Sequence, residues 1–160
     1  MSGPALVGQA AIDTVRELYA HAIAIERDAV NRYVGLAQAM DEQGNDPVAA
    51  LFRQLAVFES EQLRALEARA HGLALPPVAL ASLGIDSPET VLPERAPGLI
   101  TPRHALGIAL EAEVRARAFF TDVRTVATDP ALRALAQEMA AEEDRHIDLV
   151  EQALFGEAGL

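Results

Sequence analysis

One stretch late in the chain decides how the fold is interpreted: Ala140-Ala141-Glu142-Glu143-Asp144-Arg145-His146-Ile147. It lies in a long run whose apolar residues recur with helical spacing, at Leu135, Met139, Ile147 and Val150. Glu143 and His146 are three residues apart, so on a helix they project from one face, about 60° apart, within or beside this apolar stripe. Because burying an unpaired charge is costly, a carboxylate and an imidazole at this place need a partner.

Two interpretations of this pair are open. Glu-x-x-His is a short pattern, and a Glu–His pair on the helix surface at the edge of the core would explain it. The alternative is one half of a two-metal site in a four-helix bundle, where Glu-x-x-His recurs together with single glutamates from other helices.

The composition limits the fold and the chemistry. A chain of 160 residues is long enough for one domain with a full core, and we expect a single domain over 1–160. The 51% hydrophobic and 4% aromatic content indicates a core of Ala, Leu, Val and Ile, which suits closely packed helices. Because the chain has no cysteine, any transition metal must be bound by His and carboxylate ligands.

Charge and hydropathy exclude several classes of partner. The net charge of −11 argues against nucleic acid and against anionic membrane surfaces. No apolar run reaches the roughly 18–20 residues of a membrane span, and the start of the chain lacks the pattern of a secretory signal. We therefore expect a soluble cytoplasmic protein.

Turn and cap residues predict four helices, at about 14–43, 46–71, 101–127 and 129–154. Thr14 and Glu17 have the spacing of a capping box, and Gly44 is expected to end the first helix. Asp46 before Pro47 is expected to be the N-cap of the second helix, and Thr101 the N-cap of the third.

Residues 72–100 break the helical pattern, since they contain five prolines and two internal glycines after Gly72. This segment is long enough to run back along a 25-residue helix, roughly 37 Å, and so favours a crossover between the second and third helices. A linker between two independent hairpins and a dimerisation arm are the alternatives.

The two halves of the chain repeat each other. Glu26 lies twelve residues after Thr14, and Glu113 lies twelve residues after Thr101. Glu59 and Glu143 lie thirteen and fourteen residues after the Asp of an Asp-Pro pair, Asp46 and Asp129 respectively. Each predicted helix thus places one glutamate on its apolar face. Four clustered carboxylates must either take up protons or bind cations, and two divalent metals would balance their charge.

This arrangement resembles the ferritin-like superfamily of di-iron carboxylate proteins, and within it the rubrerythrin-like group, from Thr14 to about Leu154 with 73–100 unmatched. The resemblance implies an all-α, ferritin-like four-helix bundle of two antiparallel hairpins with a long crossover. It implies two iron ions, with manganese or zinc as other metals. The ligands it implies are terminal Glu26 and Glu113, bridging Glu59 and Glu143, and His146 on the second metal.

The chain departs from this pattern at Gln62, where the family has His. A glutamine carbonyl is a weaker ligand for iron than imidazole. Gln62 or water could complete the shell of the first metal, or that metal could bind weakly and be lost. The third possibility is that only the second metal is retained, by Glu113, Glu143 and His146 with Glu59 nearby.

The resemblance implies reduction of peroxide or dioxygen, or oxidation of ferrous iron, but leaves enzyme activity open. Without cysteine there is no rubredoxin domain, so electrons would come from a separate protein or from ferrous iron, and a homodimer is expected. One alternative is a helical scaffold or interaction protein whose metal site has decayed. Another is a single zinc or iron site used structurally.

The remaining candidates are expected to be structural. Tyr33 fits a core tyrosine better than a hydrogen-bond donor to a metal ligand, although its face is that of Glu26. His21 and His104 turn away from the glutamates and are expected to be exposed or at an interface. His71 falls at a helix end, where a cation suits the dipole.

Overall fold

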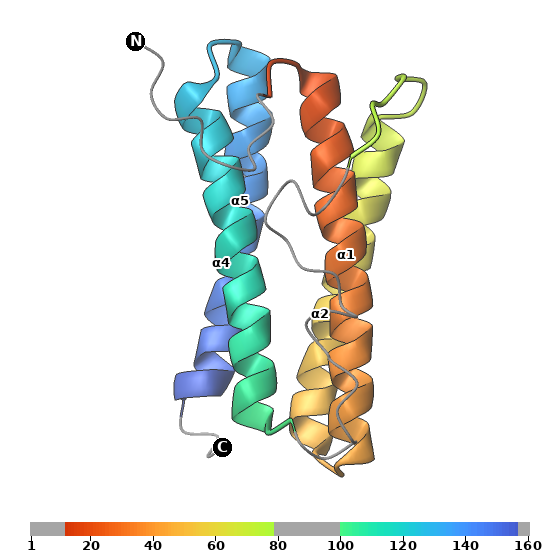
Figure 1. Ribbon diagram of the computed structural model, residues 1–160, viewed down its shortest axis with the longest axis vertical. Coiled ribbons are helices and arrows are strands. Elements are labelled where there is room, and N and C mark those ends of the chain that lie inside the picture. The colour runs from red at the N-terminus through yellow and green to blue at the C-terminus, as the bar shows by residue number, and fades with distance from the viewer. Residues whose placement is uncertain (1–11, 79–99, 157–160) are drawn as a thin grey trace.

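The computed structural model describes residues 12–78 and 100–156, and in these ranges the fold is all-α (Figure 1). Its four helices are α1 (Val15–Glu42), α2 (Asp46–Arg69), α4 (Pro102–Val126) and α5 (Pro130–Phe155). They form a four-helix bundle, as the composition and the helical spacing predict. Most of the predicted crossover, residues 79–99, lies outside the described residues.

Local capping explains where the helices begin. The Thr14 side chain accepts a hydrogen bond from the Glu17 backbone N–H at 3.1 Å, and that of Thr101 accepts one from the His104 N–H at 3.0 Å, which confirms both predicted caps. We expected Asp46 to be the N-cap of α2, and this prediction is wrong. The Asn45 side chain takes this role, accepting from the Val48 N–H at 3.2 Å, and Asp46 adds a negative charge to the first turn.

The end of α1 depends on a glycine. Gly44 has a φ of +73°, in the left-handed region that side chains with a Cβ rarely adopt. It follows the C-cap Gln43 and lets the chain reverse within three residues into α2. α1 and α2 therefore run in opposite directions along their length, as do α4 and α5 (Figure 1).

Helix contacts divide the bundle into two closely packed pairs. α1 packs most extensively on α2, and α4 on α5, while α1 also touches both α4 and α5. α1 is thus the helix that joins the pairs, and α2 and α5 make few contacts with each other in the described residues. The end of α2 and the start of α4 lie at opposite ends of the bundle (Figure 1).

The apolar core consists of two clusters, one toward each end of the bundle. The first cluster includes Leu18 and Ile25 of α1, Leu66 of α2, Phe120 of α4 and Met139 of α5. The second includes Tyr33, Leu36, Met40, Phe52, Leu106 and Val150. On every helix a buried glutamate falls between the residues of the two clusters: Glu26, Glu59, Glu113 and Glu143. The core therefore has a polar layer at mid-height.

Two further findings concern the helix surfaces. Ala65 of α2 is exposed, and Gln62, one turn earlier on the same helix, is only half-buried. Among the described residues, none of the four helices combines the length and the apolar character that a bilayer span requires.

Candidate metal centre

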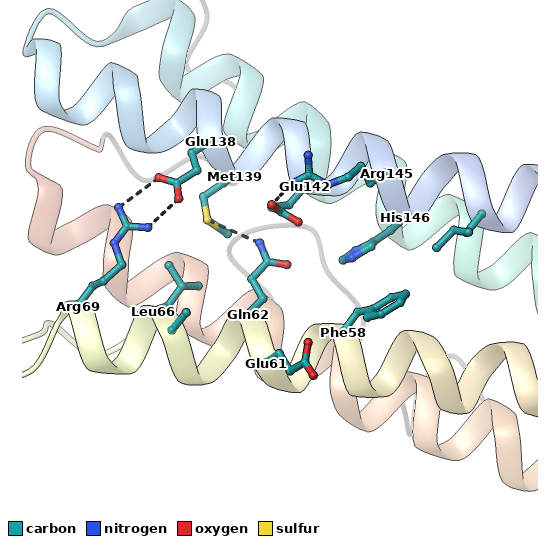
Figure 2. Close-up of a pocket in the computed structure, with 12 residues that line it drawn as sticks. Phe58, Glu61, Gln62, Leu66, Arg69, Glu138, Met139, Glu142, Arg145 and His146 are labelled. Carbon is teal, nitrogen blue, oxygen red and sulfur yellow. Dashed lines mark hydrogen bonds and ion pairs between the residues drawn. The ribbon is translucent and has the colours of Figure 1, made fainter.

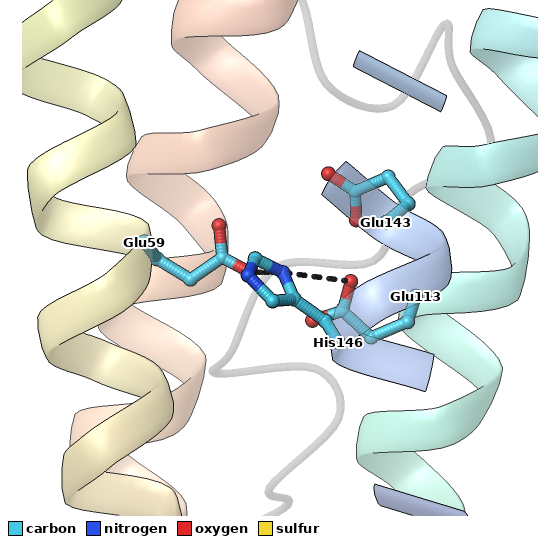
Figure 3. Close-up of side chains that lie close together, drawn as sticks. All are labelled: Glu59, Glu113, Glu143 and His146. Atoms are coloured by element: carbon cyan, nitrogen blue, oxygen red, sulfur yellow. Dashed lines mark ion pairs between the residues drawn. The ribbon is translucent and has the colours of Figure 1, made fainter. Parts of the chain in front are cut away.

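Four buried side chains converge in the polar layer: Glu59, Glu113, Glu143 and His146. Each offers one ligand atom, and these atoms all lie within 4.8 Å of one another. Glu59 comes from α2, Glu113 from α4, and Glu143 and His146 from α5 (Figure 3). None of the four residues is more than 4% exposed. Carboxylates and an imidazole at this separation are a donor set that fits iron, manganese or zinc.

The contacts within this group are close without being hydrogen bonds. His146 Nδ1 lies 2.8 Å from Glu59 Oε1 and 3.8 Å from Glu113 Oε2. Nevertheless His146 Nδ1 and both carboxylate oxygens of Glu59 have no hydrogen-bond partner, because the angles do not suit one. Buried polar atoms are nearly always satisfied. Acceptor atoms that crowd together and remain unsatisfied are what a cation between them would explain.

Glu26 adds a fourth carboxylate to the layer. Its side chain is completely buried, and neither of its oxygens has a hydrogen-bond partner. It lines a small cavity together with Glu113 and Glu143. Burial, and next the charge of Glu59, raise the pKa of Glu26 well above its ordinary value. The charge of Glu26 therefore interacts with the same cluster, although Glu26 contributes none of the four ligand atoms that lie closest together.

Burial and the neighbouring charges shift the pKa values of all four residues in the metal-free cluster. Burial raises the pKa of Glu59, and burial followed by the charge of Glu26 raises the pKa of Glu143 well above its usual range. For Glu113 and His146, burial acts against the net shift of the pKa. The close contacts of Glu113 with Glu143, His146 and Tyr33 nevertheless lower its pKa to about 2, and the close contacts of His146 with Glu113 and Glu59 raise its pKa to about 10.

Tyr33 is both a core residue and a hydrogen-bond donor. It is 1% exposed, packs beside Phe52 with ring centroids 6.0 Å apart, and its hydroxyl donates to Glu113 Oε1 at 2.5 Å. Burial raises its own pKa well above the ordinary value. The hydroxyl thus stays protonated and fixes the Glu113 carboxylate, which combines the two roles that the sequence left as alternatives.

Gln62 lies beside the cluster, on the side of α2 that faces α5. Its Nε2 is 3.9 Å from Met139 Sδ, and its buried Oε1 has no hydrogen-bond partner (Figure 2). Gln62 and His146 line the same groove between α2 and α5. Phe58, one turn before Gln62, stacks on the His146 ring with centroids 6.4 Å apart and the planes at 5°.

His21 is a correction. We expected an exposed or interface residue, but His21 is 7% exposed, its Nδ1 donates to the Glu17 carbonyl at 2.7 Å, and its ring stacks on Phe119. The reason is that α1 contacts the three other helices and so buries more than one face. His104 and His71 are exposed, and the expectation for His104 is therefore confirmed.

A buried ion pair beside the cluster was not predicted. Asp28 and Arg32 form an i,i+4 pair on α1 with both side chains buried, and they line the small cavity that Glu26 also lines. Burial raises the pKa of Asp28, while the charge of Arg32 opposes this. The signal in the sequence was the four-residue spacing of opposite charges, which surface helices also show.

Comparison with known proteins gives one informative match. No family model and no curated protein matches the chain. A solved crystal structure of an uncharacterized conserved protein from Magnetospirillum magnetotacticum is 30% identical in sequence, with a TM-score of 0.78. The alignment covers 89% of this chain and 94% of that one. Identity over nearly the whole of both chains shows common descent, and the chain belongs to the same family as this uncharacterized protein.

Proposed function

We propose that this protein is a metal-binding, rubrerythrin-like member of the ferritin-like superfamily, with a di-iron carboxylate centre. One observation carries the proposal: Glu59, Glu113, Glu143 and His146 converge within 4.8 Å, buried, with several of their polar atoms unsatisfied. The fold is consistent with it, since two antiparallel helix pairs place the end of α2 and the start of α4 at opposite ends of the bundle. A crossover would have to span that length.

In this proposal the two glutamates of α2 and α5, Glu59 and Glu143, would help to hold both metals. Glu113 and His146 complete one metal site, and Tyr33 orients Glu113 through its hydrogen bond. Glu26 would help to hold the other metal, and Gln62 or water would complete the set of ligands there. Four carboxylates against two divalent ions would give a neutral buried site, which offsets the burial and the repulsion that raise the pKa values of Glu26 and Glu143.

Iron bound at this site would supply redox chemistry for reducing peroxide or dioxygen, or for oxidising ferrous iron. The protein's own residues bind and orient the metals and shield them, since the ligands are almost fully buried. Electrons would come from a separate donor or from ferrous iron itself. We propose a cytoplasmic homodimer as the working form, to be checked by light scattering.

The experiment compares metal content in matched variants. Protein from iron-supplemented cells is analysed for iron, manganese and zinc per chain, as wild type, Glu143→Ala and Glu151→Ala. Glu151 is an exposed glutamate of the same helix and serves as the control. We expect up to two metals per chain in wild type and Glu151→Ala, and fewer than half as many in Glu143→Ala. Equal metal content in wild type and Glu143→Ala would overturn the proposal.

A single structural metal is the second candidate, and it is favoured by the composition of the group whose ligand atoms lie closest together. The atoms that converge most closely include ligands from α2, α4 and α5 but none from α1. This candidate predicts one metal per chain, a lower melting temperature after chelation, and no consumption of peroxide by the ferrous protein. Metal stoichiometry and a peroxide assay on the same sample distinguish the two.

A further inference from the structure

A groove of about 490 Å³ lies between α2 and α5 and reaches the candidate metal centre. Its inner end is formed by His146 and Gln62, and Figure 2 shows both side chains between the two helices. Dioxygen and peroxide need far less room, whereas organic ligands occupy pockets of roughly 300–1,000 Å³. The size of the groove therefore fits a larger molecule than the substrates considered so far.

The lining of the groove indicates what kind of molecule it accepts. The apolar part of the wall is made by Phe58, Leu66, Met139 and Leu149. The charged groups are mostly paired with each other: Arg69 contacts Glu138 at 2.9 Å, and Arg145 contacts Glu142. Glu61 adds one negative charge to these two pairs. An anion would therefore find no unpaired cation among these lining residues, and a neutral molecule is favoured.

Gln62 supplies the polar contact. Its Oε1 is buried without a hydrogen-bond partner, although its Nε2 approaches Met139 Sδ. An unsatisfied buried acceptor is costly, and a ligand with a hydroxyl or N–H donor would satisfy it. In an apolar pocket, one such polar group fixes the orientation of the ligand.

We propose that this groove binds a neutral, largely apolar organic molecule through a hydroxyl donor to Gln62 Oε1, and holds it against the His146 side of the metal centre. The inference rests on the proposed function only for the presence of the metal, because the groove itself is formed by the protein alone. In this inference Gln62 binds the organic molecule, in addition to any contact that it makes with the first metal.

The first experiment blocks the groove. 1-Naphthol, which is neutral at pH 7 and carries one hydroxyl donor, is titrated into metal-loaded protein by calorimetry. Ala65→Trp fills the groove from an exposed position of α2, and Ala68→Trp adds the same bulk at an exposed alanine of α2 that does not line the groove. We expect Ala65→Trp to weaken binding at least tenfold and Ala68→Trp to leave it unchanged. No saturable binding to wild type, or equal binding to both variants, would overturn the inference.

The second experiment tests the polar contact. Gln62→Leu keeps the bulk of the side chain but removes the acceptor, and should weaken 1-naphthol about fivefold, the value of one hydrogen bond. Naphthalene, which has no donor, should bind wild type and Gln62→Leu equally, and 1-naphthoate should bind wild type more weakly than 1-naphthol. Equal loss for naphthol and naphthalene would contradict the assigned contact.

Metal content, measured on every sample, separates this inference from the proposed function. A wild type that carries metal but does not bind 1-naphthol refutes the groove ligand and leaves the metal centre standing. A wild type that binds 1-naphthol but carries no more metal than Glu143→Ala refutes the metal centre and leaves the groove as a ligand site.

Discussion

The two helix pairs carry the same pattern with one different residue, and the difference decides how each side of the centre is built. On α5 the pattern is Glu143-x-x-His146, and on α2 it is Glu59-x-x-Gln62. His146 is 4% exposed and its Nδ1 lies 2.8 Å from Glu59 Oε1, inside the cluster. Gln62 is half-buried, contacts Met139, and lines the groove.

This contrast indicates a centre with a closed side and an open side. Around His146 the ring is enclosed by Phe58 and by the carboxylates of Glu59 and Glu113. Gln62 is half-buried and so lies on the more open side, although His146 and Phe58 line the same groove. A repeat of helix pairs would give two equivalent halves, and the half that carries the amide in place of the imidazole is the more accessible one. The predictions below test this asymmetry, beginning with the largest expected effect.

Removal of a shared carboxylate should abolish the stabilisation that metal gives. At a free metal concentration of 1,000 times the dissociation constant, binding adds about 4 kcal/mol to the free energy of unfolding. In Glu143→Ala this gain should fall close to zero, because a bridging ligand serves both halves. Denaturant unfolding with and without ferrous iron measures it, and Glu151→Ala should keep the full gain. An undiminished gain in Glu143→Ala would show that the cluster is not the binding site.

The stability of the metal-free protein should fall as the pH rises. The pKa values of Glu26, Glu59 and Glu143 are raised above their ordinary value of 4.5, so the stability associated with their protonated forms is complete below pH 4.5. It is lost as the pH rises through the raised values. The stability linked to His146 is complete below pH 6.5 and is lost by about pH 10, in the same direction. The effect of Glu113, whose pKa is about 2, is constant above pH 5.

The melting temperature of chelated protein should therefore fall steadily between pH 5 and pH 9. Metal-loaded protein should show a smaller fall or a rise, because the cation replaces the protons and binds more tightly as they leave. Circular dichroism melts of both forms measure the difference, with Glu143→Gln as a variant whose chelated form should have a shallower slope. A melting temperature of chelated protein that rises over this range would refute the interpretation of the cluster.

Making the two halves alike should strengthen the weaker site. Gln62→His places an imidazole at the position that corresponds to His146, and imidazole binds iron and zinc better than an amide does. We expect metal per chain to rise toward two and affinity for the first metal, the one beside position 62, to rise about tenfold. Competition with a chelator of known affinity measures this. The converse variant, His146→Gln, should lower affinity below that of wild type, and if neither variant changes stoichiometry, position 62 does not face a metal.

Local signals in the sequence were sufficient for the helices and for the glutamate layer, but not for the groove. Thr14 and Thr101 act through bonds to N–H groups three residues away, so their caps could be read directly. The glutamates were found because a repeat of the chain places them on corresponding faces. Asn45 was missed because it stands beside Asp46, a residue equally suited to capping.

The other features that escaped prediction depend on how the helices pack. His21 and the Asp28–Arg32 pair are buried because α1 contacts the three other helices, which its periodicity alone does not reveal. Ala65 is exposed and lines a groove made by residues of α2 and α5, two helices that no local pattern brings together. The role of Gln62 could not be predicted for the same reason, since in the sequence it is only a missing histidine.

The smallest expected effect concerns the hydrogen bond of Tyr33 to Glu113, on the closed side of the centre. Tyr33→Phe keeps the ring contact with Phe52 but removes the donor, and should lower the free energy of unfolding by about 1.5–3 kcal/mol, as for hydrogen bonds to charged groups. The same variant should raise the pKa of Glu113, because one of the interactions that lowers it is lost. Metal stoichiometry should stay unchanged, since Tyr33 orients a ligand without being one. Tyr33→Leu, which also loses the ring, separates the two contributions: a loss of stability equal to that of Tyr33→Phe would mean that the hydroxyl accounts for the whole effect. If Tyr33→Phe is as stable as wild type, the hydrogen bond does not help to hold the closed side together.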